Sequence, residues 1–346
     1  KLIRECVLCR KMRAPTMTQQ MAPLPADRVA SVPPFTNTGI DVFGPFLIHD
    51  GISTRKTTAT KKVWVLICVC LCSRAVHLEM LPHMDTSSFR NALRRFIAIR
   101  GTCKLLRSDQ GSNFTCAKRQ FESIDICSIQ NELKMKQCEW KLNPPGASHF
   151  GGCYERKIGS IRRVLEASLL LMGPRSISRD EFSTLIQEAG SIVNNTPMWE
   201  VSSSPDDPTP LSPAMLITLR DFRDPVSTES FSEADLLSYG KLRWRRSQYL
   251  ADSFWSRWRN EYLHTLQKRH KWLTVKPCIT PGDLVLIRDK TSKRNNWPSG
   301  IVSEVHKSSD NLVRSVTLKT TGPSSRKCTR AISDLVLLMP SKNHPC

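Results

Sequence analysis

An uninterrupted run of apolar residues, VWVLICVCLC at 63–72, limits the possible folds of this chain more than any other feature. The run is too short for a helix that crosses a bilayer, which needs about 20 residues. It suits a strand that is buried on both faces. We therefore expect a central sheet with helices packed over it.

The segments around this run predict the other elements of the sheet. Strand patterns at 39–48 (GIDVFGPFLI) and 74–81 (RAVHLEML) flank it, so three neighbouring strands are expected. Apolar residues at three- and four-residue intervals predict a helix that is capped by Thr86 and ended by Gly101. A fourth strand, KLLRS at 104–108, and a second helix follow. This order indicates an α/β fold, a mixed sheet flanked by helices.

Charge points to a class of partner. The chain has 51 Lys and Arg against 31 Asp and Glu, a formal net charge of +20. Such a charge favours polyanions, with nucleic acid first among them, although excess cations can also serve solubility alone. The odd number of cysteines, 13, and their apolar surroundings indicate free thiols in a reducing, intracellular compartment. From the non-Met start at Lys1 we expect a piece of a larger polyprotein.

Three acidic residues lie at positions from which their carboxylates could converge. Asp41 lies in the middle of a predicted strand, where aspartate is disfavoured. Asp109 follows the fourth strand, and Glu155 lies one turn into the second predicted helix, which opens near Phe150. Converging carboxylates repel one another unless cations lie between them, and Mg²⁺ prefers such oxygen ligands. The alternative is a core aspartate, a turn residue and an exposed helix charge with no common role.

The surrounding motifs support the first interpretation. GIDVFGPF, RSDQGSNF and HFGGCYERKIGSIRRVL resemble the three motif blocks of the retroviral-type integrase core, which has an RNase H-like fold and a D, D, E triad. The whole chain resembles integrases of the Pao/BEL class of LTR retrotransposons. The resemblance implies that Asp41, Asp109 and Glu155 hold two Mg²⁺ or Mn²⁺ ions. It also implies trimming of element DNA ends and their joining to target DNA, by a nuclear homo-multimer that needs no membrane or small-molecule substrate.

The chain departs from that family pattern in a few places. The segment between Asp109 and Glu155 is longer than usual, which predicts an insertion, and residues 121–137 are its expected place. Ser148 replaces a usual proline and Tyr154 a common tryptophan. Gly159 stands where many integrases have a basic residue.

Basic residues near the triad and toward the C-terminus are the expected DNA contacts. Arg162 shares a helix face with Glu155 and is expected to hold a phosphate, with Arg156 and Arg163 beside it, although a solvated basic face is an equal alternative. In the long Trp-rich helix that follows, aromatic residues at helical spacing favour packing over base stacking. Arginines there and basic residues of the last strands suit phosphate contacts. These further candidates are Arg243, Arg245, Arg246, Arg288, Lys290, Arg294, Lys327 and Arg330.

Cys6 and Cys9 have the C-x-x-C spacing of a zinc half-site, which needs two further ligands. The resemblance implies that two upstream histidines supply them. The expected domains are a truncated zinc module and linker, an RNase H-like core, a Pro/Ser-rich linker, a basic helix and an SH3-like DNA-binding barrel, at 1–30, 31–200, 201–235, 236–275 and 276–346. Two other functions stay open: a domesticated or inactive nucleic-acid-binding derivative, and an RNase H-type nuclease.

Overall fold

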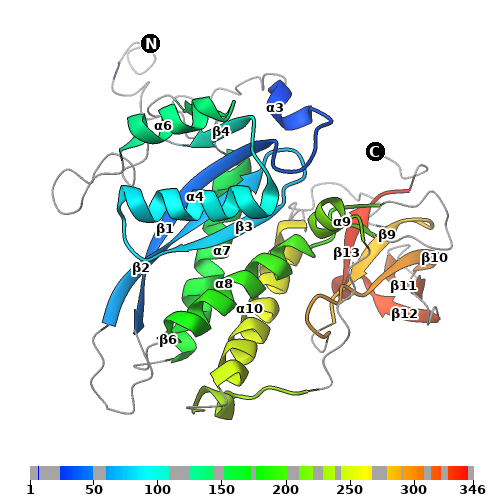
Figure 1. Cartoon of the computed structure of the whole chain (residues 1–346). Coiled ribbons are helices and arrows are strands. Elements are labelled where there is room, and N and C mark those ends of the chain that lie inside the picture. The colour runs from blue at the N-terminus through cyan, green and yellow to red at the C-terminus, as the bar shows by residue number, and fades with distance from the viewer. Residues whose placement is uncertain are drawn as a thin grey trace.

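A computed structural model shows two large sheets joined by a helical layer, and a small two-stranded sheet of β7 and β8 (Figure 1). The residues it describes are Val7, 24–49, 60–108, 125–143, 152–172, 177–200, 210–220, 229–237, 243–266, 279–289, 292–307, 313–320 and 326–341.

The larger sheet is mixed, as the sequence predicted. Its strand order is β3-β2-β1-β4-β5, and β6 pairs with the far end of β1. Strand β2 is antiparallel to both of its neighbours, β1 and β3, whereas β4 and β5 run parallel to β1. The strands are β1 Asn37–His49, β2 Thr60–Cys70, β3 Val76–Leu81, β4 Leu105–Ser108, β5 Glu139–Leu142 and β6 Ile177–Ser178. All four strands predicted around the apolar run are therefore confirmed.

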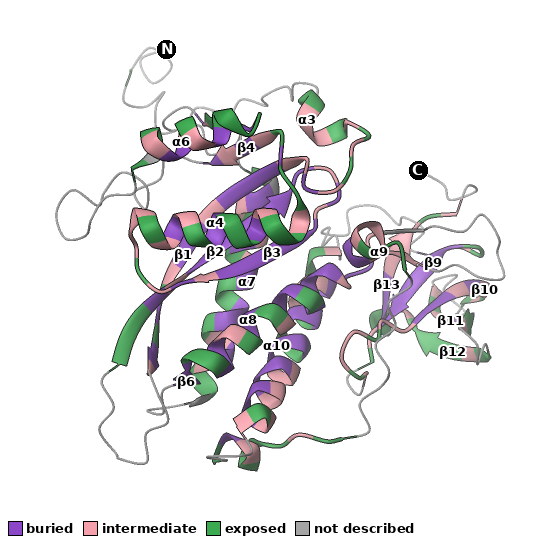
Figure 2. Cartoon of the chain, viewed as in Figure 1, coloured by how far each residue is buried: buried purple, intermediate pink, exposed green. Residues whose placement is uncertain are grey.

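The apolar run forms β2 and the first residues after it, and it is buried on both faces. Leu66, Cys68 and Cys70 belong to the hydrophobic cluster on one side of the sheet. Val65 and Ile67 belong to the cluster on the other side. This alternation follows from the two-residue period of a strand. Figure 2 shows the buried residues concentrated in the central strands, so the sheet requires cover on both sides.

Helix α4, Thr86–Arg100, covers one face of this sheet with Phe89, Leu93 and Phe96. The N-cap is Asp85, whose side chain accepts a hydrogen bond from the backbone N–H of Ser88 at 2.6 Å. The expectation that Thr86 caps the helix was wrong by one residue. Both side chains can cap, and the helix begins one position earlier than a Thr86 cap requires. The helix ends at Gly101, as predicted.

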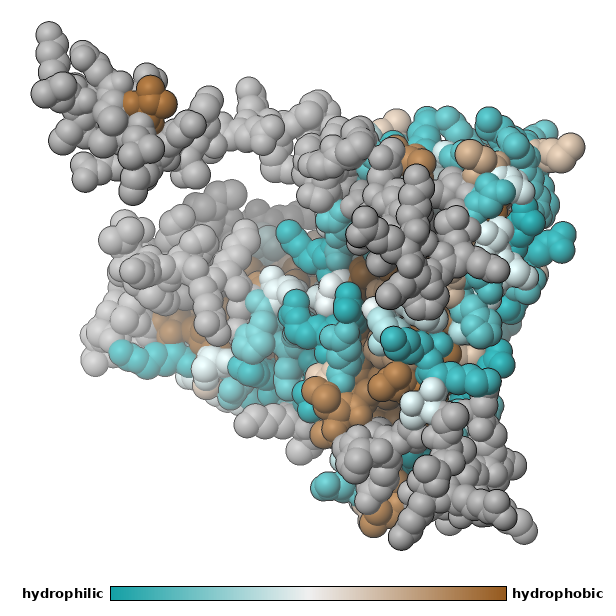
Figure 3. Space-filling view, turned by 90° about the vertical axis from the view of Figure 1, so that its left-hand side faces the viewer, coloured by the Kyte–Doolittle hydropathy of each residue, from teal (hydrophilic) through white to brown (hydrophobic). Residues whose placement is uncertain are grey.

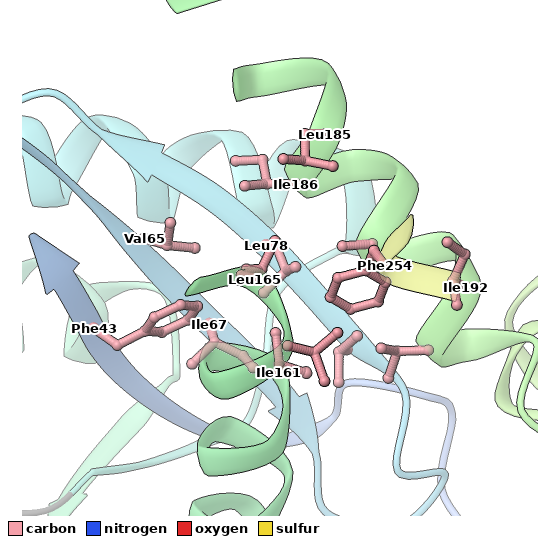
Figure 4. Packing of buried hydrophobic residues seen from close by; sticks show 14 of the residues in the cluster. Phe43, Val65, Ile67, Leu78, Ile161, Leu165, Leu185, Ile186, Ile192 and Phe254 are labelled. Carbon is pink, nitrogen blue, oxygen red and sulfur yellow. The ribbon is translucent and has the colours of Figure 1, made fainter. Parts of the chain in front are cut away.

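Three long helices cover the other face: α7 Gly152–Leu169, α8 Arg179–Asn194 and α10 Arg243–Leu266. Figure 4 shows Phe43, Val65 and Ile67 of the sheet facing side chains from these helices. Ser178 and Glu181 form a reciprocal capping box at the start of α8. Because α10 contributes Phe254 to the same cluster, the basic helix is a third member of this layer.

The second sheet is antiparallel, with strand order β12-β11-β10-β9-β13. Its strands are β9 Leu284–Ile287, β10 Ser299–Lys307, β11 Val313–Thr320, β12 Lys327–Ala331 and β13 Leu335–Met339. An all-β C-terminal unit is thereby confirmed, while its closure into an SH3-like barrel stays a prediction. Leu286 and Val336 of this sheet pack against Leu263 near the end of α10.

Shorter elements complete the described chain. They are α3 Ala26–Val29, α6 Ile126–Met135, β7 Trp199–Glu200, β8 Pro210–Leu211, α9 Pro213–Thr218 and the 3₁₀ turns Leu170–Met172, Glu233–Leu237 and Ile332–Asp334. Helix α6 falls within 121–137, the place expected for an insertion, and β8 and α9 fall within the expected linker. In the part of the chain that the structure describes, no helix is both long and apolar enough to cross a membrane.

Candidate active site

Asp41 lies in the middle of β1, on the face of the sheet that α7 covers. It alternates with Gly39 and Phe43, and Phe43 belongs to the cluster under α7. Its neighbours Ile40 and Val42 point to the other face and are buried. Asp41 itself is half-buried, and its Oδ1 accepts a hydrogen bond from the backbone N–H of Val42 at 2.8 Å. The carboxylate thus keeps access to solvent in the centre of a sheet, as a ligand requires.

The carboxyl end of β4 lies beside the part of β1 that leads into Asp41. The two strands are parallel, and Gly39 is opposite Arg107. Strand β4 ends at Ser108. Asp109 is the next residue in the sequence and lies outside the described residues, so its place in the site stays a prediction.

The first turn of α7 meets β1 at Gly39. A Cβ atom at this glycine would lie 2.5 Å from Cδ1 of Tyr154, because the tyrosine ring packs directly on the strand backbone. Glu155 follows Tyr154 in the same turn and is half-buried. The start of α7 therefore lies against β1 two residues before Asp41. The end of β4 and the start of α7 thus both lie against β1 close to Asp41, while the meeting of the three carboxylates stays a prediction.

A buried polar network links the same segments. Asn143, just after β5, donates its backbone N–H to the carbonyl of Ser108 at 2.9 Å and its side-chain amide to the hydroxyl of Tyr154 at 2.6 Å. The indole N–H of Trp140 donates to Oγ of Ser108 at 2.9 Å. Ser108, Asn143 and Tyr154 are at most 1% exposed. Sequence reasoning missed this network; the one visible signal was the tyrosine where the family commonly has tryptophan.

Cations gather close to Glu155 on α7. Burial, together with the nearby Arg74, lowers the pKa of Lys157 to about 8. Arg156 is exposed. Arg162 is also exposed and pairs with Glu166, one turn further on, at 2.8 Å. Arg163 pairs with Glu261 of α10. These exposed arginines are accessible to a phosphate, and their contact with DNA stays a prediction.

The structure corrects one predicted DNA contact, Arg246, and shows inward ion pairs for another, Arg294. Arg246 is 2% exposed and pairs with the equally buried Glu181 at 3.2 Å. Arg294 lies in a loop of the second sheet and bonds inward to α8 and α10, at 3.1 Å from Glu188 and 2.7 Å from Asp252. The guanidinium group of Arg246 is therefore buried away from the surface, whereas that of Arg294 is 17% exposed and is held by two carboxylates.

The remaining predicted contacts differ in environment. Arg245 pairs with Asp235 at 2.7 Å and with Glu229 at 3.2 Å, and the hydrogen bond to Asp235 raises its pKa. Lys327 is 69% exposed. Arg330 is exposed, and Arg243 and Arg288 are half-buried. Lys290 lies outside the described residues.

Hydrophilic side chains dominate the described part of the face in Figure 3, with a smaller hydrophobic group among them.

Two tryptophans of α10 pack inside the protein. Trp255 and Trp258 are 3% and 4% exposed. The indole N–H of Trp258 donates to Oγ1 of Thr196 at 2.9 Å, and its ring stacks on Phe254. Packing rather than base stacking was the favoured interpretation, and it is confirmed for these two residues.

Among the described residues, no group of three or more His, Cys, Asp or Glu side chains is placed to hold an ion. Asp109, the third member of the predicted triad, lies outside the described residues. Cys6 and Cys9, the predicted zinc ligands, also lie outside the described residues. The donors that are described, Asp41 and Glu155, are half-buried carboxylates, and their hard oxygens fit Mg²⁺ or Mn²⁺.

The described residues form a mixed sheet in which β1 carries Asp41 and in which the helix that carries Glu155 starts against the same strand. Residues 42–148 match the family model of the integrase core domain. This match includes Asp109, begins one residue after Asp41 and ends before Glu155. The chain thus contains a region similar to the integrase core domain.

Other comparisons add detail. Residues 242–338 match a model described as a family of unknown function (DUF5641), which spans α10 and most of the second sheet. No curated protein matches the chain. One solved structure it matches is the cryo-EM structure of a simian T-cell lymphotropic virus intasome in complex with PP2A regulatory subunit B56 gamma. Identity is 10% and the TM-score is 0.37, over 99% of this chain and 90% of that one.

Proposed function

We propose that the chain is a retrotransposon integrase that trims the 3′ ends of element DNA and transfers them to target DNA. One observation carries this proposal: the ring of Tyr154 on Gly39 brings the helix of Glu155 against the strand of Asp41, within a chain whose residues 42–148 match the integrase core model. The Pao/BEL class, the nuclear location and the zinc module belong to the same proposal.

Asp41, Asp109 and Glu155 would hold two Mg²⁺ or Mn²⁺ ions. When bound, such ions activate the attacking oxygen and stabilise the leaving oxygen of an in-line displacement at phosphorus. The chain's own residues place these carboxylates. Rigid elements of the sheet and α7 fix the backbone at Asp41 and Glu155, which reduces the reorganisation needed for reaction.

Exposed cations would hold the DNA backbone. Arg156 and Arg162 lie on the helix of Glu155, and Arg330 lies on the outer strand of the second sheet. Contacts of this kind bind any sequence and weaken with salt. Joining two DNA ends in one reaction also implies more than one subunit, so we include a homo-multimer in the proposal.

The test is an end-joining assay with the purified chain, labelled duplex ends and Mg²⁺ or Mn²⁺. Trimmed and joined products are expected, and EDTA should abolish both. Asp109→Asn should abolish the products while leaving DNA affinity within about twofold, because the amide no longer brings the negative charge that a divalent ion requires. The matched control is Asp125→Asn, which changes an exposed aspartate at the start of α6.

Three results would contradict the proposal. Equal product from Asp109→Asn and the wild-type chain would exclude the triad as the active site. DNA binding without any product from the wild-type chain would favour the binding-only derivative. Cleavage confined to the RNA strand of hybrids would favour the RNase H-type nuclease.

A further inference from the structure

The hydroxyl of Tyr154 belongs to a polar network that the reaction itself does not use. It accepts a hydrogen bond from the side-chain amide of Asn143 at 2.6 Å, and Asn143 in turn holds the carbonyl of Ser108 at 2.9 Å. All three residues are at most 1% exposed. Water cannot replace a bond lost at this depth, so each bond has a strong preference for one geometry.

The network joins three elements that are far apart in the sequence. Ser108 ends β4, Asn143 follows β5 and Tyr154 lies in the first turn of α7. Two of these residues directly precede a predicted metal ligand: Ser108 comes before Asp109, and Tyr154 before Glu155. A shift of either backbone would therefore move a carboxylate.

Tyr154 also contacts the third ligand-bearing element. Its ring lies so close to Gly39 that a Cβ atom there would be 2.5 Å from Cδ1. Gly39 is two residues before Asp41 in β1. A single side chain thus touches β1 through its ring and reaches the end of β4 through its hydroxyl and Asn143.

We propose that Tyr154 is a positioning residue: its hydroxyl, through Asn143 and Ser108, fixes the start of α7 relative to the end of β4 and so sets the spacing of the metal-binding carboxylates. This inference rests on the proposed function, because the ligands are those of the integrase triad. Residues that orient metal ligands without touching the ion typically change metal affinity by about 10- to 100-fold when they are lost.

Tyr154→Phe removes the hydroxyl and keeps the ring on Gly39. The matched control is Tyr262→Phe, which removes a hydroxyl bonded to the carbonyl of Pro197, at the contact between α10 and the end of α8. For the whole chain, the melting temperature and the strand-transfer rate are followed as Mn²⁺ is added. We expect the Mn²⁺ midpoint of Tyr154→Phe to rise about tenfold or more. Tyr262→Phe should keep the wild-type midpoint even if its melting temperature without metal falls.

A second variant tests the connection itself. Asn143→Ala removes the partner of the Tyr154 hydroxyl, so its Mn²⁺ midpoint should rise as well. If the two residues act through one bond, the double variant should show a smaller rise than the two single effects combined. Additive effects would contradict a shared path.

The outcomes separate this inference from the proposed function. An unchanged Mn²⁺ midpoint in Tyr154→Phe, with a normal wild-type response, would overturn the positioning role and leave the integrase proposal intact. A wild-type chain that shows neither an Mn²⁺-dependent rise in melting temperature nor joined products would overturn both.

Discussion

At the residue scale, the most constrained position near the site is Gly39. Its hydrogen is all that separates the β1 backbone from the ring of Tyr154, so even a methyl group must displace one of them. The glycine is therefore needed for close approach between helix and strand, and the sequence alone gave no sign of this. Its requirement arises from a contact between residues 39 and 154.

We predict that Gly39→Ala lowers the free energy of unfolding by about 1–3 kcal/mol, the usual cost of forcing extra volume into a packed interior. Gly159→Ala is the control on α7, where a Cβ atom would meet nothing within 4 Å. In a helix this change should stabilise the chain by about 0.5–1 kcal/mol. Urea unfolding of both variants measures the difference, and an equal stability of the two would contradict the close contact.

A second prediction at this scale concerns the two kinds of arginine. Arg246→Ala should destabilise the chain by about 3–5 kcal/mol, because it leaves the buried carboxylate of Glu181 without its counter-charge. Arg330→Ala should change stability by less than about 0.5 kcal/mol, because that side chain is exposed. It should instead reduce the salt dependence of DNA binding by about one unit of log–log slope. Chemical unfolding and salt-titrated binding distinguish the two roles.

At the scale of elements, the local pattern of apolar residues was enough to predict a strand or helix where that pattern matches how the element is buried. The apolar run predicted β2, and three- and four-residue spacing predicted α4 and the apolar side of α7. What could not be predicted depends on partners distant in the sequence. The network of Ser108 and Asn143 is one case. The ion pair of Arg246 with Glu181 is another. An arginine in a basic helix looks the same in the sequence whether it faces solvent or a buried glutamate.

Helix α10 carries its own prediction, because its aromatic residues hold it against the core. Trp258→Ala should lower the free energy of unfolding by about 3–5 kcal/mol, the usual cost of removing a large buried side chain. Trp244 is 47% exposed on the same helix, and Trp244→Ala should cost less than about 1 kcal/mol. If both variants weakened DNA binding equally without changing stability, base stacking would replace packing as the role of these rings.

At the scale of the whole molecule, the second sheet is attached to the half that contains the mixed sheet through α10. Trp297, in the loop before β10, packs edge-on against Trp255 at 4.9 Å and Tyr262 at 5.4 Å between ring centroids. Arg294 of the same loop bonds to both α8 and α10. The orientation of the sheet, and of any DNA bound to it, is thus set relative to the predicted active site.

This attachment predicts which part of the molecule unfolds locally when the contact is weakened. Arg294→Ala should cost about 1–3 kcal/mol, since it leaves the partly buried Glu188 and the more exposed Asp252 without their shared cation. Because the loss falls on the contact between the two halves, amide hydrogen exchange should become faster in β9 and β13 and stay unchanged in β2. Lys327→Ala, at an exposed cation of the same sheet, should alter neither region. Faster exchange spread evenly over both sheets would mean that the halves unfold as a single unit, and the sheet would then depend on the core for its stability as well as its orientation.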